Sequence, residues 1–213
     1  MLRWLNFQPR HNNDRQQIAV TKKVRRVPYS LDAVGIIQLS HEDLVAILRG
    51  ADDLIMRGGR SVLAKLLKGS REKRVLELGL DKNPAYGHFK GLPVEDVTAR
   101  IDWTILSGYL ALEYDYRLPL LVYTDRGWEI EKETYAAELL EGFDRMLDSG
   151  TTTFDMEYLK NRDRAMILRL LDKVEAARDL KYVPLLRAWQ QLDHRKVRER
   201  IQAVIDSLLR GAS

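Results

Sequence analysis

Cysteine is absent from this sequence of 213 residues. Without a thiol, the chain can form no disulfide framework, thiolate-ligated zinc site or cysteine nucleophile. Histidine is scarce, and the four that occur, at positions 11, 41, 88 and 194, share no metal-binding spacing such as H-E-x-x-H. We therefore expect no metal ion and no other cofactor.

A phosphate-binding loop of the form G-x-x-x-x-G-K-[ST] is also missing, because the nearest glycine cluster, RGGRSVLAK, has the wrong spacing. Carboxylates are plentiful, but they follow helical charge patterns that are typical of solvated faces. These observations predict that the protein is not an enzyme.

Long apolar runs are the third absence. No stretch approaches the roughly 20 apolar residues that a membrane helix needs. The N-terminal run MLRWLNF is interrupted by Arg3 and followed by QPRHNND, so it lacks the length and the cleavage site of a signal peptide. We expect a soluble cytoplasmic protein with no membrane partner.

What is present is the composition of an ordinary globular protein, with 45% apolar and 31% charged residues. The net charge of +4 permits a nucleic-acid partner without requiring one. Residues 1–35 carry seven of the cations, at positions 3, 10, 15, 22, 23, 25 and 26. This segment reads either as a nucleic-acid-binding arm or as a solvated tail with one docked strand, such as VGIIQL.

Apolar periodicity predicts three helices, at residues 40–58, 60–69 and 93–107. Ser40 is the expected N-cap of the first, and two short runs rich in strand formers follow the third, separated by the loop DYRLP. This order is typical of a winged helix-turn-helix, so we expect a mainly helical α+β fold. An acidic helix continues to the Gly150 linker, and three further helical patterns end the chain.

A set of residues in fixed order resembles the RQC domain, the winged helix that follows the motor in RecQ helicases. The set is Leu67-Lys68-Gly69-Ser70, Arg74, Gly79, Tyr86-Gly87, Trp103, Gly108-Tyr109-Leu110, Leu121 and the turn from Tyr123 to Gly127. The chain is most similar to the small stand-alone bacterial RQC-minor group, which implies DNA binding. It lacks the motor and the cysteine-ligated zinc of RecQ enzymes.

The segment YVPLLRAWQQLDHRKVRERIQAVIDSL is similar to about one and a half HEAT repeats, with a proline early in the first helix and Asp193 in the turn. So short a solenoid must pack on something else. We therefore expect three parts: a basic arm (residues 1–35), an RQC-like winged helix (36–149) and a HEAT-like module (150–213).

Candidate DNA contacts fall into three groups. A basic run on the second helix and the loop after it comprises Arg57, Arg60, Lys65, Lys68, Ser70, Arg71, Lys73 and Arg74. It matches phosphate spacing along a duplex, and unpaired amides near Ser70 and the Gly69 break would help the backbone approach a phosphate. The apolar residues Val75, Leu76 and Leu78 would hold the loop on the core. The alternative is a solvated face.

The third helix is expected to contribute little to base recognition, because its exposed positions include Glu95, Asp96 and Asp102, which repel phosphate. Thr98 and Arg100 are the only candidates on it. Trp103 is expected to be a core residue.

In the hairpin, Tyr114, Tyr116 and Arg117 lie in or beside a loop that strands cannot cover. Aromatic side chains there can stack on an exposed base pair at a duplex end, although Tyr114 could instead pack on the sheet.

The sequence thus predicts a non-catalytic DNA-binding protein that captures duplex phosphates and senses duplex ends or forks with its wing. RNA remains an alternative, because phosphate contacts dominate the binding of both nucleic acids. The other alternative is an adaptor that docks a protein partner through its C-terminal helices.

Overall fold

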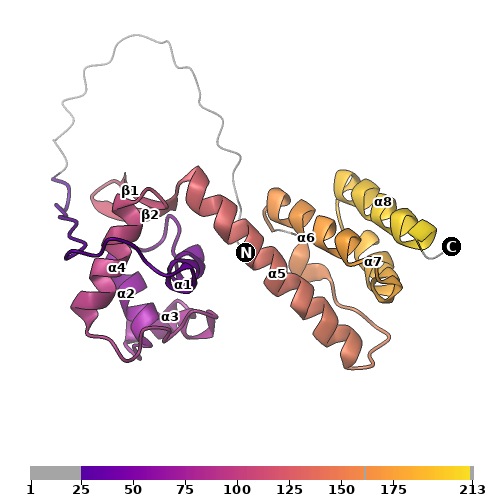
Figure 1. The fold of residues 1–213 in the computed structure, drawn as a ribbon, viewed down its shortest axis with the longest axis horizontal. Helices are drawn as coiled ribbons and strands as arrows, with labels where there is room; N and C mark the ends of the chain where they lie inside the picture. The colour runs from indigo at the N-terminus through magenta and orange to yellow at the C-terminus, as the bar shows by residue number, and fades with distance from the viewer. Residues whose placement is uncertain (1–24, 161, 212–213) are drawn as a thin grey trace, which may run out of the picture. The chain divides into compact units, whose positions relative to one another are not determined.

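The computed structural model describes residues 25–160 and 162–211 (Figure 1). Among them the chain forms two compact units, residues 25–131 and residues 132–211, and the division falls within one long helix. Most of the predicted basic arm, residues 1–24, lies outside the described residues, so its role stays a prediction.

The first unit is a set of helices followed by a two-stranded antiparallel hairpin. Its elements are α1 (His41–Asp52), α2 (Arg60–Lys68), α3 (Lys73–Glu77), the 3-10 helix η1 (Leu80–Lys82), α4 (Val94–Leu106), β1 (Leu110–Asp115), β2 (Leu118–Tyr123) and the start of α5 (Asp125–Asp148). The mainly helical α+β class predicted from the sequence is confirmed. Its assignment to the winged helices stays a prediction.

α1 begins at the predicted cap. The Ser40 hydroxyl accepts a hydrogen bond from the amide three residues on, at 3.1 Å. The helix ends at Asp52, six residues earlier than expected, because the chain then turns toward the hairpin. The Met56 amide donates to the carbonyl of Leu121 at 3.0 Å, and the Leu121 amide donates to Gly58 at 3.0 Å. Residues 56–58 therefore run alongside β2.

One apolar core joins α1, α2, α4 and the hairpin. Its fully buried side chains include Ile47, Leu48, Leu54, Leu63, Leu66, Leu67, Ile101, Leu110 and Leu121. Each leucine or isoleucine stabilises the fold by about 1.5–3 kcal/mol when it is fully buried. The loop after α2 and the base of the hairpin are thus attached to a rigid support.

The turn from β2 into α5 depends on a close approach of two backbone segments. The Thr124 hydroxyl donates to the Gly108 carbonyl at 2.7 Å, and Gly127 packs against the carbonyl of Tyr109. A Cβ at Gly127 would lie 1.9 Å from that oxygen. Only glycine fits there, so the α5 start is fixed beside β1.

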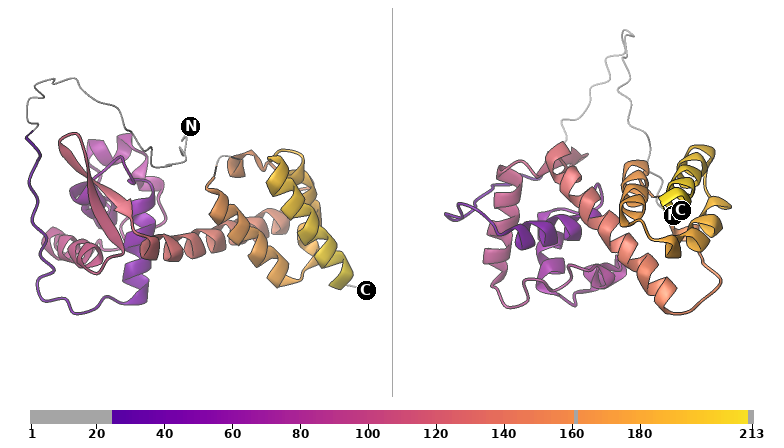
Figure 2. Two further views of the ribbon diagram at one scale, coloured as in Figure 1. Left: turned by 90° about the horizontal axis from the view of Figure 1, so that it is seen from above. Right: turned by 45° about the vertical axis from the view of Figure 1, so that its right-hand side comes forward.

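Residues 25–39 precede α1 and lie along the outside of the first unit, where they pass α4 (Figure 2). The docked strand predicted at VGIIQL does not form, because residues 34 and 35 make a turn, with Val34 at φ 46°. The segment is held by single hydrogen bonds instead, such as that from the Trp103 indole to the Ile37 carbonyl at 3.1 Å.

The second unit holds the remainder of α5, η2 (Glu157–Leu159), α6 (Arg164–Ala177), η3 (Leu180–Tyr182), α7 (Val183–Gln190) and α8 (Arg195–Gly211). α8 packs against both α6 and α7. The buried Trp189 meets Phe143 edge to face, with ring centroids 6.0 Å apart. The three helical patterns predicted here are present, and their HEAT-like nature stays a prediction.

No helix within the described ranges is long and apolar enough to cross a membrane. Across those same residues, no group of three or more histidine, aspartate or glutamate side chains is placed to hold a metal ion.

Candidate nucleic-acid interface

Residues 70–74, which we call the basic loop, follow α2 and run into α3. Arg71, Lys73 and Arg74 are all exposed. Lys73 lies 3.6 Å from Glu77, but both side chains face solvent, so this pair contributes little. Arg71 and Arg74 form no ion pair with the residues that the structure describes. The basic loop therefore presents two uncompensated guanidinium groups.

The backbone at the start of the basic loop is held by the segment that contains Tyr86 and Gly87. The Tyr86 hydroxyl donates to the Ser70 carbonyl at 3.1 Å, and the Gly87 amide donates to the Leu66 carbonyl at 3.0 Å. Val75 is fully buried, as predicted. Leu76, by contrast, is exposed, because residues 73–77 form a short helix that was not predicted and that turns this side chain outward.

Gly69 has a structural role that the sequence did not predict. It ends α2 in the left-handed region at φ 70°, and a Cβ there would lie 3.1 Å from the Cα of Gly87. The glycine therefore lets two protein segments meet, and its role in the approach of a phosphate stays a prediction. The Ser70 amide is also occupied, because it donates to the Lys65 carbonyl at 2.9 Å. The Ser70 hydroxyl oxygen accepts from the Glu72 amide at 3.2 Å, which leaves its O–H to donate to a ligand.

The cations predicted along α2 do not form one face. Lys65 is 2.6 Å from Glu72, and the Lys68 ammonium donates to the carbonyls of Lys90 and Leu92. Arg57 lies before the start of α2, whose nine residues span roughly 13 Å. It is thus at the other end of the helix from the basic loop, beside β2.

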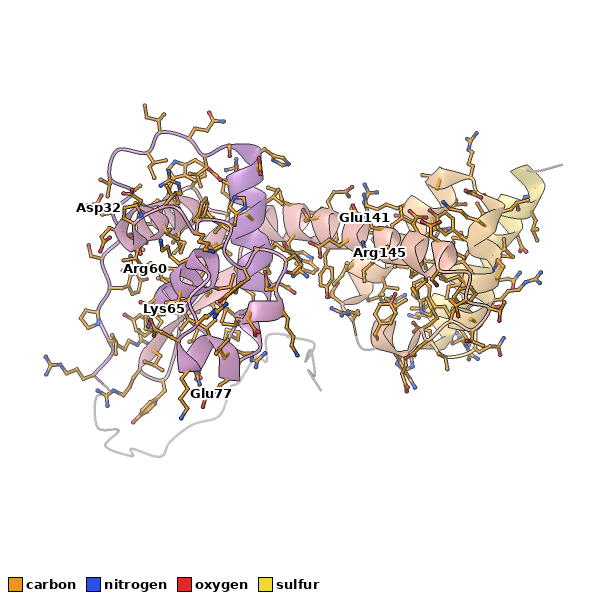
Figure 3. All side chains as sticks on the ribbon, turned by 90° about the horizontal axis from the view of Figure 1, so that it is seen from below. Asp32, Arg60, Lys65, Glu77, Glu141 and Arg145 are labelled. Carbon is orange, nitrogen blue, oxygen red and sulfur yellow. The ribbon has the colours of Figure 1, made fainter. Side chains whose placement is uncertain are left out.

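Arg60 points inward from α2. Arg60 is labelled in Figure 3. Its guanidinium lies 2.6 Å from Asp102 and donates to the Ser30 carbonyl at 2.7 Å. Asp102 is buried, so the expectation that it repels phosphate from an exposed position on α4 is wrong. Its charge is instead neutralised within the fold.

The two candidate DNA-contacting residues on α4 both form hydrogen bonds with backbone carbonyls of the same helix. The Thr98 hydroxyl donates to the Val94 carbonyl at 2.8 Å, and Arg100 donates to the Asp96 carbonyl at 2.9 Å. Glu95 and Asp96 are exposed in the first turn. The solvent side of α4 is thus acidic at its start, and its small contribution to base recognition stays a prediction.

The hairpin ends in a two-residue turn, Tyr116-Arg117, because Asp115 pairs directly with Leu118. The loop is shorter than the DYRLP loop that was predicted. Tyr116 is 72% exposed and has φ 51°, a region that bulky residues rarely occupy. The tip thus holds one aromatic ring out in solvent.

Tyr114 and Arg117 contact residues that lie far away in the sequence. The Tyr114 hydroxyl donates to the Val27 carbonyl at 2.7 Å, and the Arg26 guanidinium lies 4.7 Å from the centre of its ring. Arg117 donates to the Arg25 carbonyl at 3.1 Å. Tyr114 therefore holds the arm against the hairpin.

This contact brings Arg25 and Arg26 to the hairpin beside Arg117, and both are exposed. The sequence predicts that they belong to an arm, but not that they lie at the hairpin tip. A pairing across some 90 residues leaves no periodicity in the sequence. The one signal was the density of cations before Pro28.

The first unit is thus a mainly helical domain that displays a fixed basic loop and a hairpin tip with an aromatic ring and three arginines. These are the features of a nucleic-acid-binding domain. The family model of the RQC domain matches residues 40–141, and the chain carries an RQC-like domain, as its motifs predicted. RQC domains are non-catalytic and bind nucleic acid, which supports DNA binding by this chain. Comparison with curated proteins and with solved structures gave no match.

Proposed function

We propose that the protein binds duplex DNA through its RQC-like domain, with the basic loop on backbone phosphates and the hairpin tip at a duplex end or fork. The main support for this proposal comes from the basic loop. Arg71 and Arg74 are exposed and without an ion pair among the described residues, on a backbone that Val75 and Tyr86 fix. Because this backbone is already ordered, only the arginine side chains lose conformational entropy when they meet a phosphate.

The affinity would come largely from released counterions. Each phosphate that a cation neutralises contributes about 0.9 to the slope of log affinity against log salt concentration. Two arginines on one loop would supply roughly two such contacts, because phosphates repeat along each strand. These contacts carry no sequence information, so we expect duplex binding with little sequence preference.

The hairpin would add a preference for shape. Tyr116 presents its ring to solvent, and Arg25, Arg26 and Arg117 lie around the same end of the hairpin. An exposed ring can stack on the terminal base pair of a duplex, whereas an internal pair must first be unstacked. The three arginines would hold the backbone on either side.

The test uses the whole chain with Arg71→Gln and Arg74→Gln together. We expect duplex affinity to fall about tenfold at ~0.1 M salt, and the salt slope to fall by about 2. A control with Arg187→Gln and Arg210→Gln removes the same charge from α7 and α8. Binding is measured by fluorescence anisotropy, and folding by circular dichroism.

Unchanged affinity and salt slope in the folded Arg71/Arg74 variant would show that the basic loop does not bind phosphate. An equal loss in the control would mean that net charge alone drives binding. Structured RNA serves as a parallel substrate. If it binds at least ten times more tightly than DNA of equal length, the protein is an RNA-binding one.

A further inference from the structure

A second basic site lies in the second unit, formed by η2, the first turn of α6 and the turn between α7 and α8. A cavity of about 400 Å³ opens there, which we call the C-terminal basic cavity. Its basic lining residues are Lys160, Arg162, Arg164, His194, Arg195 and Lys196. None of them is on the element that carries the basic loop.

The cavity has almost no negative charge of its own. Asp193 is the single carboxylate among the described residues that line it. Both of its oxygens are engaged within the fold, because one accepts from the Trp189 indole at 2.8 Å and the other from the His194 amide at 2.7 Å. Asp193 is therefore fixed as a structural group of the α7–α8 turn.

Lys160, Arg164 and Lys196 are exposed and form no ion pair with any residue that the structure describes. Several other cations of the unit do form ion pairs. For example, Arg169 and Lys173 both form ion pairs with Glu133. Arg200 lies 2.8 Å from Asp172 and 2.6 Å from Glu175. Three exposed cations without an ion pair among the described residues thus lie around one hollow, while others of this kind in the unit, such as Arg187 and Arg198, lie outside its lining.

The support beneath these cations is rigid. Leu159, Ile167 and Val197 line the cavity and are buried in the helical core. Like charges that are held close together repel one another, so an anion that enters the cavity is attracted by all of them and relieves this repulsion. Another cavity, of about 750 Å³, shows the contrast, because Asp172 and Glu175 line it together with two arginines.

The lining also indicates what kind of anion fits. Among the described residues that line the cavity there is no phenylalanine, tyrosine or tryptophan, and the small imidazole of His194 is the one aromatic ring on which a base could stack. Lysine and arginine side chains on an open rim suit a phosphate group attached to a larger molecule. The site therefore suits a phosphodiester better than a free nucleoside or its base.

We propose that the C-terminal basic cavity is a second phosphate-binding site for the nucleic acid that the RQC-like domain binds, so this inference rests on the proposed function. The site would contact the backbone of the same molecule without reading its bases. Long duplexes would then bind more tightly than short ones, because both units contribute to one complex.

The test combines Lys160→Gln, Arg164→Gln and Lys196→Gln in the whole chain. The matched control carries Arg178→Asn, Arg187→Gln and Arg210→Gln, which removes three charges from the same unit outside the cavity; asparagine is used at Arg178 because its φ is 51°. We expect the cavity variant to lose about tenfold in affinity for a 40-base-pair duplex, with little loss on a 12-base-pair duplex, and the control to lose less than twofold.

Wild-type affinity of the folded cavity variant for the long duplex would overturn this inference and leave the proposed function intact, provided that the Arg71/Arg74 variant is weakened. No binding by the wild-type chain would overturn both. Inorganic phosphate is the second probe. Its binding to the wild-type chain, with unchanged duplex affinity in the cavity variant, would assign the cavity to a free anion and contradict the inference.

Discussion

Arg60 on α2 and Asp102 on α4 form an ion pair in which one guanidinium nitrogen lies 2.6 Å from each carboxylate oxygen. The same guanidinium donates to the Ser30 carbonyl, and the Asp32 amide donates to Asp102 at 2.9 Å. This network therefore joins residues 30–32, α2 and α4. Because the Asp102 side chain is only 4% exposed, Arg60 neutralises a charge that water cannot reach.

The first prediction is that Asp102→Ala destabilises the protein without weakening DNA binding selectively. Removal of one partner leaves the other charge poorly compensated, which costs about 3 kcal/mol in unfolding free energy. Glu95→Ala removes an exposed acid from the same helix and should cost less than about 0.5 kcal/mol. Urea unfolding measures both, and equal effects of the two changes would contradict the structural role of the pair.

The second prediction concerns Gly69, whose positive φ and contact with Gly87 fix the start of the basic loop. Gly69→Ala should cost about 1–2 kcal/mol of stability, since a side chain is strained there and must displace a backbone atom. Gly91→Ala is the control, because a Cβ at Gly91 meets nothing within 4 Å. Thermal unfolding compares them, and a neutral Gly69→Ala would show that the loop adapts freely.

The main elements of the fold could be predicted because their signals are local. The Ser40 cap, the periodicity of α4 and the two apolar runs of the hairpin each lie within about 20 residues of sequence. The predicted end of α1 is wrong, because Met56 and Gly58 form backbone hydrogen bonds with Leu121 of β2, more than 60 residues away. Such pairing leaves no local signal.

The candidate site was only partly predictable for the same reason. Exposed cations at Arg71 and Arg74 follow from the pattern after α2, and the structure places them as expected. That Arg60 is turned toward Asp102, 42 residues on, could not be read from the sequence, since both residue types are common on solvated faces.

The third prediction uses the pKa of Glu133. Hydrogen bonds from Arg169 and Lys173 lower the pKa of this carboxyl to about 2, below its unfolded value of about 4.3. The stabilising contribution is therefore complete above about pH 5 and is lost as the pH falls toward 2. Because the side chain is 45% exposed, solvent screening reduces the contribution to about 1 kcal/mol.

Glu133→Gln should therefore speed hydrogen exchange of the α6 amides about fivefold at pH 7, after correction for intrinsic rates, and have little effect near pH 2.5. Glu141→Gln is the control, since Glu141 pairs with Arg145 at 3.7 Å on the solvent side. An effect of Glu133→Gln that is equal at both pH values would show that the ion pairs do not anchor α6.

The last prediction depends on the geometry of the hairpin tip. Tyr116 is exposed, and its φ of 51° is a conformation that asparagine tolerates better than a bulky residue. Removal of the ring by Tyr116→Asn therefore adds no backbone strain. Tyr116→Phe keeps the ring and serves as the matched control.

We expect Tyr116→Asn to lower affinity for a forked duplex about tenfold, because stacking on a base contributes about 1–3 kcal/mol. Affinity for a closed circular duplex, which has no end, should stay the same, as should its salt slope, since the basic loop is intact. Tyr116→Phe should behave like the wild type on both. Competition between labelled forks and unlabelled circles measures the ratio. An equal loss on both substrates would identify Tyr116 as a support of the hairpin, and no loss on either would show that phosphate contacts alone determine binding.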